Sequence, residues 1–251
     1  MEEERREIAL KVGSFFTLFK DGSTLRTPTN PEVAADGITS KDVTLNAELG
    51  LWARIFLPSP MSMSHGVGAC LPVVLYFHGG GCIFGSPAWD NFHTFCAEMS
   101  VRSGAIWVSA SYRLAPEHRL PTAFHDSFAA LQWLRSQAIA LTEPWLTPAD
   151  FSKLFIAGES AGGTIVHHVA MRAFNHNHDH ESEDCDGISL DPLRIQGLIF
   201  IHPGFFRGKI RTQEELDCPQ DEFMTWEMAD VCIQLTLPPG CPVDTNPYFN
   251  P

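Results

Sequence analysis

The hydrophobic positions of this chain fall into two patterns. Short apolar runs predict buried strands, and they cover residues 73–77, 105–111, 154–157 and 194–201. Longer segments with an apolar residue every three or four positions predict helices, and they cover residues 91–103, 122–139 and 161–174. Buried strands that alternate with long helices are typical of a mostly parallel sheet covered by helices on both faces. The pattern therefore predicts an α/β fold.

Other segments flank this alternation. Residues 7–20 carry apolar side chains whose spacing fits an amphipathic helix ended at Asp21-Gly22; this helix either covers a pocket as a lid or packs on the core. Residues 42–48 and 51–57 predict the two strands of an antiparallel hairpin. Residues 214–237 contain an acidic helical stretch that either completes a lid or covers the sheet.

A serine stands between a predicted strand and a predicted helix. It is Ser160, in the motif Gly158-Glu159-Ser160-Ala161-Gly162. A strand-to-helix elbow lifts the hydroxyl clear of the fold, and glycines on both sides allow the backbone to turn tightly. The motif therefore predicts a nucleophilic serine.

A glycine-rich loop, His78-Gly79-Gly80-Gly81, follows the predicted strand at 73–77. Three successive glycines leave backbone N–H groups unshielded, and such groups can stabilise a developing oxyanion. A flexible turn would not explain why the loop ends a buried strand. The loop, Ser160 and His202 all follow predicted strands, and ligands of parallel sheets bind at the carboxyl ends of the strands. We therefore expect them to meet in one pocket.

Composition limits the function further. The chain has 251 residues, of which 44% are apolar and 19% charged, and this suits one domain with a sizeable core. The formal net charge of −13 argues against nucleic acid and anionic membrane surfaces as partners. The charged first residues, 1–6, predict no secretory signal, and no apolar run is long enough to span a bilayer. The seven cysteines include no C-x-x-C pair, which favours reduced thiols and a cytoplasmic location.

Three histidines alternate at His176, His178 and His180, in a polar segment over 176–187. They suggest a metal site, but a loop with no preset ligand geometry is the simpler interpretation. The chain contains neither a G-x-x-x-x-G-K-[ST] sequence nor a dinucleotide glycine fingerprint. We therefore expect no metal and no cofactor.

Three motifs in order resemble one family. They are His78-Gly79-Gly80-Gly81, Tyr112-Arg113-Leu114-Ala115-Pro116-Glu117-His118-Arg119-Leu120-Pro121 and Gly158-Glu159-Ser160-Ala161-Gly162. They resemble the plant carboxylesterases, in the hormone-sensitive-lipase-like branch of the α/β-hydrolase fold. The resemblance implies an incomplete α/β-hydrolase core over 41–251, with candidate lid helices over 212–237, after an N-terminal lid or helical segment over 1–40.

The resemblance implies a role for the serine elbow and the glycine loop. Ser160 would be the nucleophile. The N–H groups of Gly80, Gly81 and Ala161 would form an oxyanion hole, and Gly79 would shape the loop.

The same resemblance implies structural roles for nearby polar residues. The segment 112–121 would brace the pocket, and we expect Arg113 and Glu117 to form an internal ion pair, because a charge close to a core needs a partner. We expect His78 to hold the glycine loop by hydrogen bonding, and Glu159 to be structural.

The partners of the serine remain unassigned. In this fold an acid and then a histidine follow the nucleophile, each at a strand end. We expect both beyond residue 251, so that the chain is truncated at its C-terminus and its sheet lacks the last two strands. Within the chain, His202 is the best alternative base, whereas His167 and His168 lie about 10 Å or more along the helix from Ser160.

Two functions fit these features. The first is a serine carboxylester hydrolase that acts on small-molecule esters through an acyl-enzyme, inactive or weakly active as this chain. The alternative is a non-catalytic small-molecule receptor similar to the gibberellin receptors. Those receptors have a loop similar to His-Gly-Gly-Ser, whereas this chain has His78-Gly79-Gly80-Gly81, which counts against the alternative. A truncated form with no function would leave the strand at 194–201 as an exposed sheet edge. The acyl and alcohol groups and the oligomeric state stay open.

Overall fold

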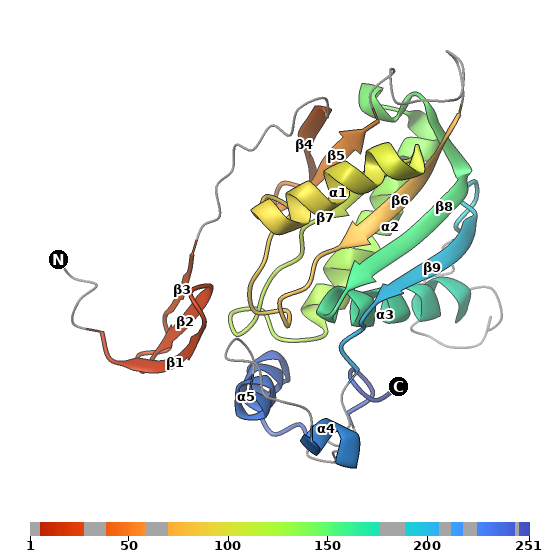
Figure 1. Ribbon diagram of the computed structural model, residues 1–251. Helices are drawn as coiled ribbons and strands as arrows, with labels where there is room; N and C mark the ends of the chain where they lie inside the picture. The colour runs from red at the N-terminus through yellow and green to blue at the C-terminus, as the bar shows by residue number, and fades with distance from the viewer. Residues whose placement is uncertain are drawn as a thin grey trace.

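The computed structural model describes residues 6–27, 39–58, 70–175, 189–205, 212–217, 225–243 and 246–251. Within these ranges the centre is a six-stranded sheet in the order β4-β5-β7-β6-β8-β9 (Figure 1). Its strands are β4 (Thr39–Asn46), β5 (Leu51–Leu57), β6 (Leu71–Phe77), β7 (Ile106–Ala110), β8 (Ala149–Glu159) and β9 (Ile195–Ile201). β4, β5 and β7 pair antiparallel, whereas β7, β6, β8 and β9 run parallel. The predicted hairpin and the mostly parallel sheet are confirmed.

Helices cover both faces of this sheet. α1 (Asp90–Ser103) lies on the face toward the viewer in Figure 1, and α2 (Thr122–Ala140) and α3 (Ala161–Asn175) lie on the other. Successive residues of a strand point to opposite faces. Leu75 and Phe77 of β6 therefore join the core on the α2 and α3 side, while Tyr76 joins the core under α1. The predicted two-faced α/β fold is confirmed.

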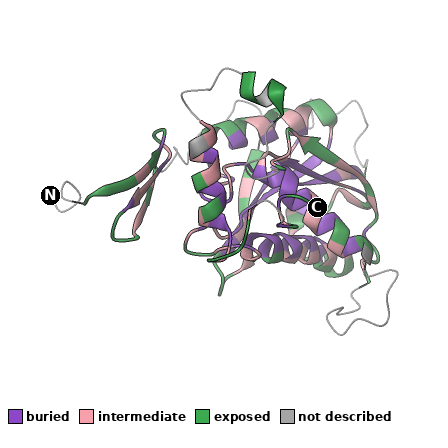
Figure 2. Ribbon diagram, turned by 90° about the horizontal axis from the view of Figure 1, so that it is seen from below, coloured by how far each residue is buried: buried purple, intermediate pink, exposed green. Residues whose placement is uncertain are grey.

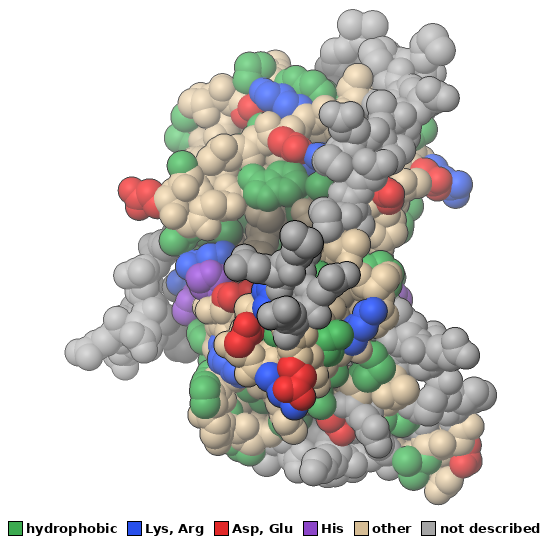
Figure 3. All heavy atoms as spheres, turned by 90° about the vertical axis from the view of Figure 1, so that its left-hand side faces the viewer, with side chains coloured by type: hydrophobic (Ala, Val, Ile, Leu, Met, Phe, Trp, Pro, Cys, Tyr) green, Lys and Arg blue, Asp and Glu red, His purple; other side chains and the backbone are tan. Residues whose placement is uncertain are grey.

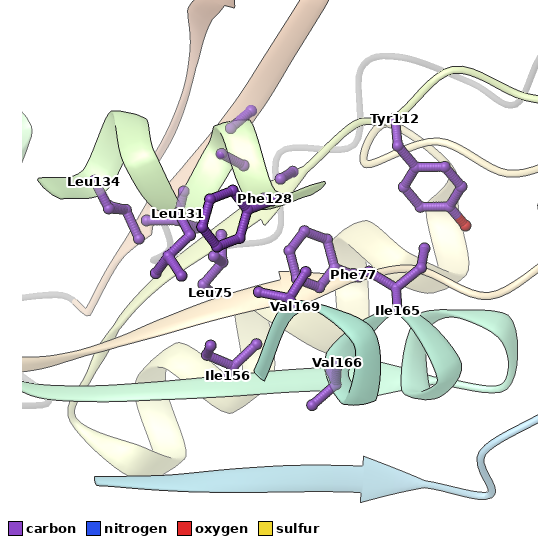
Figure 4. Packing of buried hydrophobic residues seen from close by; sticks show 14 of the residues in the cluster. Leu75, Phe77, Tyr112, Phe128, Leu131, Leu134, Ile156, Ile165, Val166 and Val169 are labelled. Atoms are coloured by element: carbon purple, nitrogen blue, oxygen red, sulfur yellow. The ribbon is translucent and has the colours of Figure 1, made fainter. Parts of the chain in front are cut away.

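The core between the sheet and α2 and α3 is built from large aliphatic and aromatic side chains. Figure 4 shows side chains of both helices converging on Leu75, Phe77 and Ile156 of the sheet. The helix side chains labelled there are Phe128, Leu131 and Leu134 of α2 and Ile165, Val166 and Val169 of α3. In Figure 2 burial is concentrated in the strands and in the helix faces turned toward them. This packing fixes the strand ends on which the candidate site is built.

The N-terminal segment forms strands, so the predicted helix over 7–20 is wrong. β1 (Ile8–Val12), β2 (Phe16–Phe19) and β3 (Thr24–Arg26) make a separate antiparallel sheet. Gly13 opens the turn after β1 in the left-handed region, with φ +51°, and this interrupts a helix. Over so short a segment, alternating apolar positions overlap with helical spacing. Whether this sheet acts as a lid stays a prediction.

Two helices lie beyond the carboxyl ends of the parallel strands (Figure 1). They are α4 (Gln213–Asp217) and α5 (Trp226–Thr236), inside the segment predicted to be helical. The N–H of Leu120 donates to Thr236 O at 2.8 Å and Arg119 Nη1 donates to Leu237 O at 2.6 Å, which fixes the end of α5 to the loop before α2. The loop with the three alternating histidines lies outside the described residues.

Large apolar side chains of the edge strand β9 are exposed to solvent. Among the described strands it pairs with β8 alone. Ile199 is 40% exposed and Phe200 41% exposed. The edge expected at 194–201 is therefore present.

The surface carries both signs of charge. On the face shown in Figure 3, acidic and basic side chains are interspersed among hydrophobic ones. No helix in the described part of the chain is long and apolar enough to cross a membrane.

Candidate active site

Ser160 lies in the one-residue turn between β8 and α3. Its φ of +52° places it in the left-handed region, which is uncommon for a residue other than glycine. A Cβ at Gly158 would lie 2.2 Å from Gly162 O, and a Cβ at Gly162 would lie 2.1 Å from Phe77 O. Glycine is therefore required at both positions, because the start of α3 crosses the ends of β8 and β6 at backbone contact.

Hydrogen bonds fix the backbone of Ser160 on both sides. Its N–H donates to Ile201 O at 3.0 Å, and its carbonyl accepts from the N–H groups of Gly163 and Gly204, both at 2.9 Å. Thr164 Oγ1 donates to Gly204 O at 2.9 Å. The elbow is therefore interlocked with the turn that follows β9, as its place at the strand ends predicts.

The glycine loop after β6 is a tight turn with three consecutive positive φ angles. These are +104° at Gly80, +60° at Gly81 and +57° at Cys82. The N–H groups of Ile83 and Phe84 both donate to Gly80 O, at 3.0 and 3.1 Å. The loop therefore has a defined conformation and is not simply a flexible glycine turn.

The turn and the elbow lie against each other. A Cβ at Gly79 would lie 3.4 Å from Ser160 Cβ and 3.2 Å from Glu159 O. Within the described residues, the backbone N–H groups of Gly80, Gly81 and Ala161 donate no hydrogen bond to the protein. Unused backbone donors therefore flank the contact between the two motifs.

His78 holds the base of the glycine turn. The residue is 1% exposed; its Nδ1 lies 2.7 Å from Gly79 O, to which it donates, and its carbonyl accepts from Tyr112 Oη at 2.8 Å. Burial lowers the pKa of His78 to about 4, so the ring is neutral near pH 7. This geometry agrees with the expectation that His78 holds the glycine loop by hydrogen bonding.

The predicted ion pair between Arg113 and Glu117 is wrong. Arg113 pairs with Asp126, which is 2% exposed, through its Nε at 2.8 Å and its Nη2 at 2.7 Å. Glu117 instead accepts from Arg26 of β3, and these hydrogen bonds lower the pKa of Glu117 to about 2. Asp126, on α2, supplies the carboxylate for Arg113, whereas Glu117 contacts Arg26, which lies 91 positions away in the sequence. Reading the sequence missed Arg26 and Asp126, because nothing local to either residue indicates its partner.

Glu159 and His202 lie beside the serine elbow. The Glu159 carboxylate accepts from Tyr76 Oη at 3.3 Å, and its other oxygen lies 3.7 Å from His202 Nε2. His168 Nε2 lies 3.0 Å from Tyr248 O, so that ring faces the last described segment of the chain. No histidine in the described ranges is hydrogen-bonded to the Ser160 hydroxyl.

A serine on a strand-to-helix elbow, beside a turn with unused amides, at the carboxyl ends of a mostly parallel sheet defines the α/β-hydrolase class. Residues 74–251 match the family model described as alpha/beta hydrolase fold. The chain belongs to the α/β-hydrolase fold family and, within it, to the plant carboxylesterases.

Individual relatives support this placement. Carboxylesterase 20 of Arabidopsis thaliana is 39% identical over 226 residues, which are 89% of this chain and 62% of that protein. Probable carboxylesterase 6 of the same plant is 34% identical over 248 residues, covering 96% of this chain and 68% of that protein. The solved esterase of Pyrobaculum calidifontis is similar with a TM-score of 0.64 and 26% identity, over 84% of this chain and 60% of that one. The chain thus spans 62% of the length of Carboxylesterase 20.

Proposed function

We propose that this chain carries the nucleophile and the oxyanion hole of a serine carboxylester hydrolase that acts on small-molecule esters. The observation that carries the proposal is the contact between Gly79 and Ser160, flanked by the unused amides of Gly80, Gly81 and Ala161. Membership of a family whose relatives are named carboxylesterases supports the same reaction.

The proposed reaction passes through an acyl-enzyme. Ser160 Oγ attacks the ester carbonyl and its proton goes to a general base. The carbonyl oxygen becomes an oxyanion, and the amides of Gly80, Gly81 and Ala161 stabilise it as donors that are already in place. The alcohol then leaves with a proton returned by the base, and water releases the acid from the acyl-enzyme.

The base is the incomplete part of this site. We propose that the histidine and its acid belong to residues outside the described ranges, as the order nucleophile, acid, histidine predicts for this fold. The alternative within the described residues is His202, which lies 3.7 Å from the Glu159 carboxylate. Without a base in reach of Ser160, the oxyanion hole and binding alone give about 10³- to 10⁴-fold acceleration over water. We therefore expect the 251-residue chain to be weakly active.

The gibberellin-receptor-like alternative gains no support from these relatives, which are named as carboxylesterases. A receptor that performs no reaction also needs no unused amides beside Ser160, whereas a developing oxyanion does.

Labelling with an alkyl fluorophosphonate tests the proposal. The probe forms a covalent bond to an activated serine, and added imidazole can replace a missing histidine base. We expect slow labelling of the chain, marked acceleration by imidazole, and the adduct on Ser160 by peptide mass mapping. The variant Ser160→Ala, with its folding checked by circular dichroism, is the control and should show neither adduct nor acceleration.

The outcomes separate the two parts of the proposal. Absence of a Ser160 adduct at high imidazole would contradict the assignment of this serine as nucleophile. Rapid labelling without imidazole would instead show that a base already reaches Ser160. In that case the variants His202→Gln and Glu159→Gln decide whether the pair beside the elbow supplies the base.

A further inference from the structure

Arg26, at the end of β3, joins segments that are far apart in the sequence. Its Nε donates to Ile83 O at 2.7 Å, and its Nη2 donates to Ala115 O at 2.7 Å. Its Nη1 and Nη2 also donate to the two carboxylate oxygens of Glu117, at 2.9 and 2.7 Å. The guanidinium therefore connects the N-terminal sheet to the turn after β6 and to the loop after β7.

The turn after β6 needs a restraint of this kind. It includes three consecutive residues with positive φ, and the third of them, Cys82, is not glycine. A backbone in this region persists when its surroundings hold it there. Arg26 holds Ile83 O, and the N–H of Ala115 donates to Cys82 O at 2.8 Å.

Aromatic contacts place the rest of the N-terminal sheet on the same segment. Phe15 stacks on Phe84 at 6.0 Å between ring centroids and on Trp89 at 5.4 Å. The Arg26 guanidinium lies over the ring of Phe16 at 5.4 Å, and Phe16 is buried. The sheet therefore packs directly against the residues that continue the glycine turn.

We propose that Arg26 is a positioning residue that sets the direction of the Gly80 and Gly81 amides, and that Glu117 orients its guanidinium. The inference rests on the proposed function, because the amides matter only if they bind the oxyanion. It makes the N-terminal sheet part of the machinery of ester hydrolysis and not simply a cover. A lysine at position 26 keeps the charge opposite Glu117, but its single nitrogen lacks the planar fork that reaches Ile83 O, Ala115 O and Glu117 together.

The test compares Arg26→Gln, Arg26→Lys and Glu117→Gln with a matched control. Lys41→Gln is the control, since it breaks a partly buried ion pair with Glu143, at 2.8 Å, that does not contact the turn. Hydrogen–deuterium exchange of the peptide 79–89 measures the order of the turn, because the N–H groups of Ile83 and Phe84 are protected only while they donate to Gly80 O. Imidazole-assisted fluorophosphonate labelling of Ser160 gives the maximal rate and the half-saturating probe concentration, and thermal melts show which variants are folded.

We expect Arg26→Gln to speed exchange in 79–89 and to lower the maximal labelling rate, while the half-saturating concentration stays unchanged. A displacement of about 1 Å at a reacting centre can cost about 100-fold, so we expect up to that loss for Arg26→Gln and about 10-fold for Arg26→Lys. Glu117→Gln should fall between the wild type and Arg26→Gln. Lys41→Gln should match the wild type in both readouts.

Opposite results would overturn the inference. If Arg26→Gln matches Lys41→Gln in exchange and in maximal rate, Arg26 does not position the turn. If it lowers the melting temperature but leaves the maximal rate unchanged, its role is purely structural. If wild-type Ser160 takes no label at all, the proposed function fails, and the exchange comparison by itself then decides whether Arg26 orders these amides.

Discussion

Adding one methyl group at each of two neighbouring glycines tests the geometry of the glycine turn. A Cβ at Gly80 would lie 2.1 Å from the backbone oxygen of Phe84, whereas the nearest atom to a Cβ at Gly81 is Ile83 Cγ1 at 3.7 Å. Gly81 has a φ of +60°, inside the left-handed region that alanine can adopt at a cost, whereas Gly80, at +104°, lies outside it. We therefore predict that Gly80→Ala is far more damaging than Gly81→Ala.

The magnitudes follow from these contacts. Gly81→Ala should lower the free energy of unfolding by about 1 kcal/mol, the cost of a left-handed backbone at a residue with a Cβ. Gly80→Ala adds about 1–3 kcal/mol of backbone strain and about 1–3 kcal/mol for the displacement of packed atoms, so we expect about 3 kcal/mol or more. The difference of about 2 kcal/mol corresponds to about 4–8 °C in melting temperature for a domain of this size.

Urea unfolding followed by circular dichroism measures the free energy of unfolding of each variant. The rate of Ser160 labelling with imidazole measures how far the turn still supports the reaction. Gly81→Ala should label at close to the wild-type rate because it keeps both amides, whereas folded Gly80→Ala should label slowly because its turn has moved. Equal stabilities and equal labelling rates for the two variants would refute the assigned turn conformation.

Two further predictions concern buried polar groups. Burial lowers the pKa of His78 to about 4 from 6.5, so as pH falls the unfolded chain takes up this proton before the folded chain does. The free energy of unfolding should therefore fall by up to about 3 kcal/mol between pH 6.5 and 4. The difference between wild type and His78→Asn in urea unfolding across this range should show that slope, and parallel curves would contradict it. Asp126→Ala should cost about 3 kcal/mol in urea unfolding, because it leaves the partly buried Arg113 guanidinium unpaired. The control Glu98→Ala, which breaks the exposed pair with Arg102, should cost about 0.5 kcal/mol or less, and equal costs would refute this reading.

Local pattern was enough to predict most of the domain. The apolar runs gave β6, β7 and β9, and the helical stripes gave α1, α2 and α3, each within two residues of its observed bounds. The run at 154–157 gave only the centre of β8, which begins five residues earlier, at Ala149. The serine elbow and the glycine loop could be placed together, since parallel strands present their carboxyl ends at one edge of a sheet. Their roles in catalysis remain a proposal that the labelling experiments test.

Local pattern failed where the outcome depended on distant segments. The apolar spacing over 7–20 predicts a helix, but over so few residues it fits the strand period as well as the helical one. The segment forms β1 and β2, which pack Phe15 and Phe16 against the residues after the glycine turn. Tertiary packing decided between two conformations of similar local propensity.

The sequence by itself predicted where the proposed site residues stand, because a glycine-flanked serine between a strand and a helix, and a run of glycines that ends a strand, are patterns that can be read locally. Tertiary structure alone decided the charge partners: Arg113 with Asp126, and Glu117 with Arg26. An ion pair depends on the distance between two side chains in space, and residues 26 and 117 come together only when the sheet and the N-terminal strands have packed.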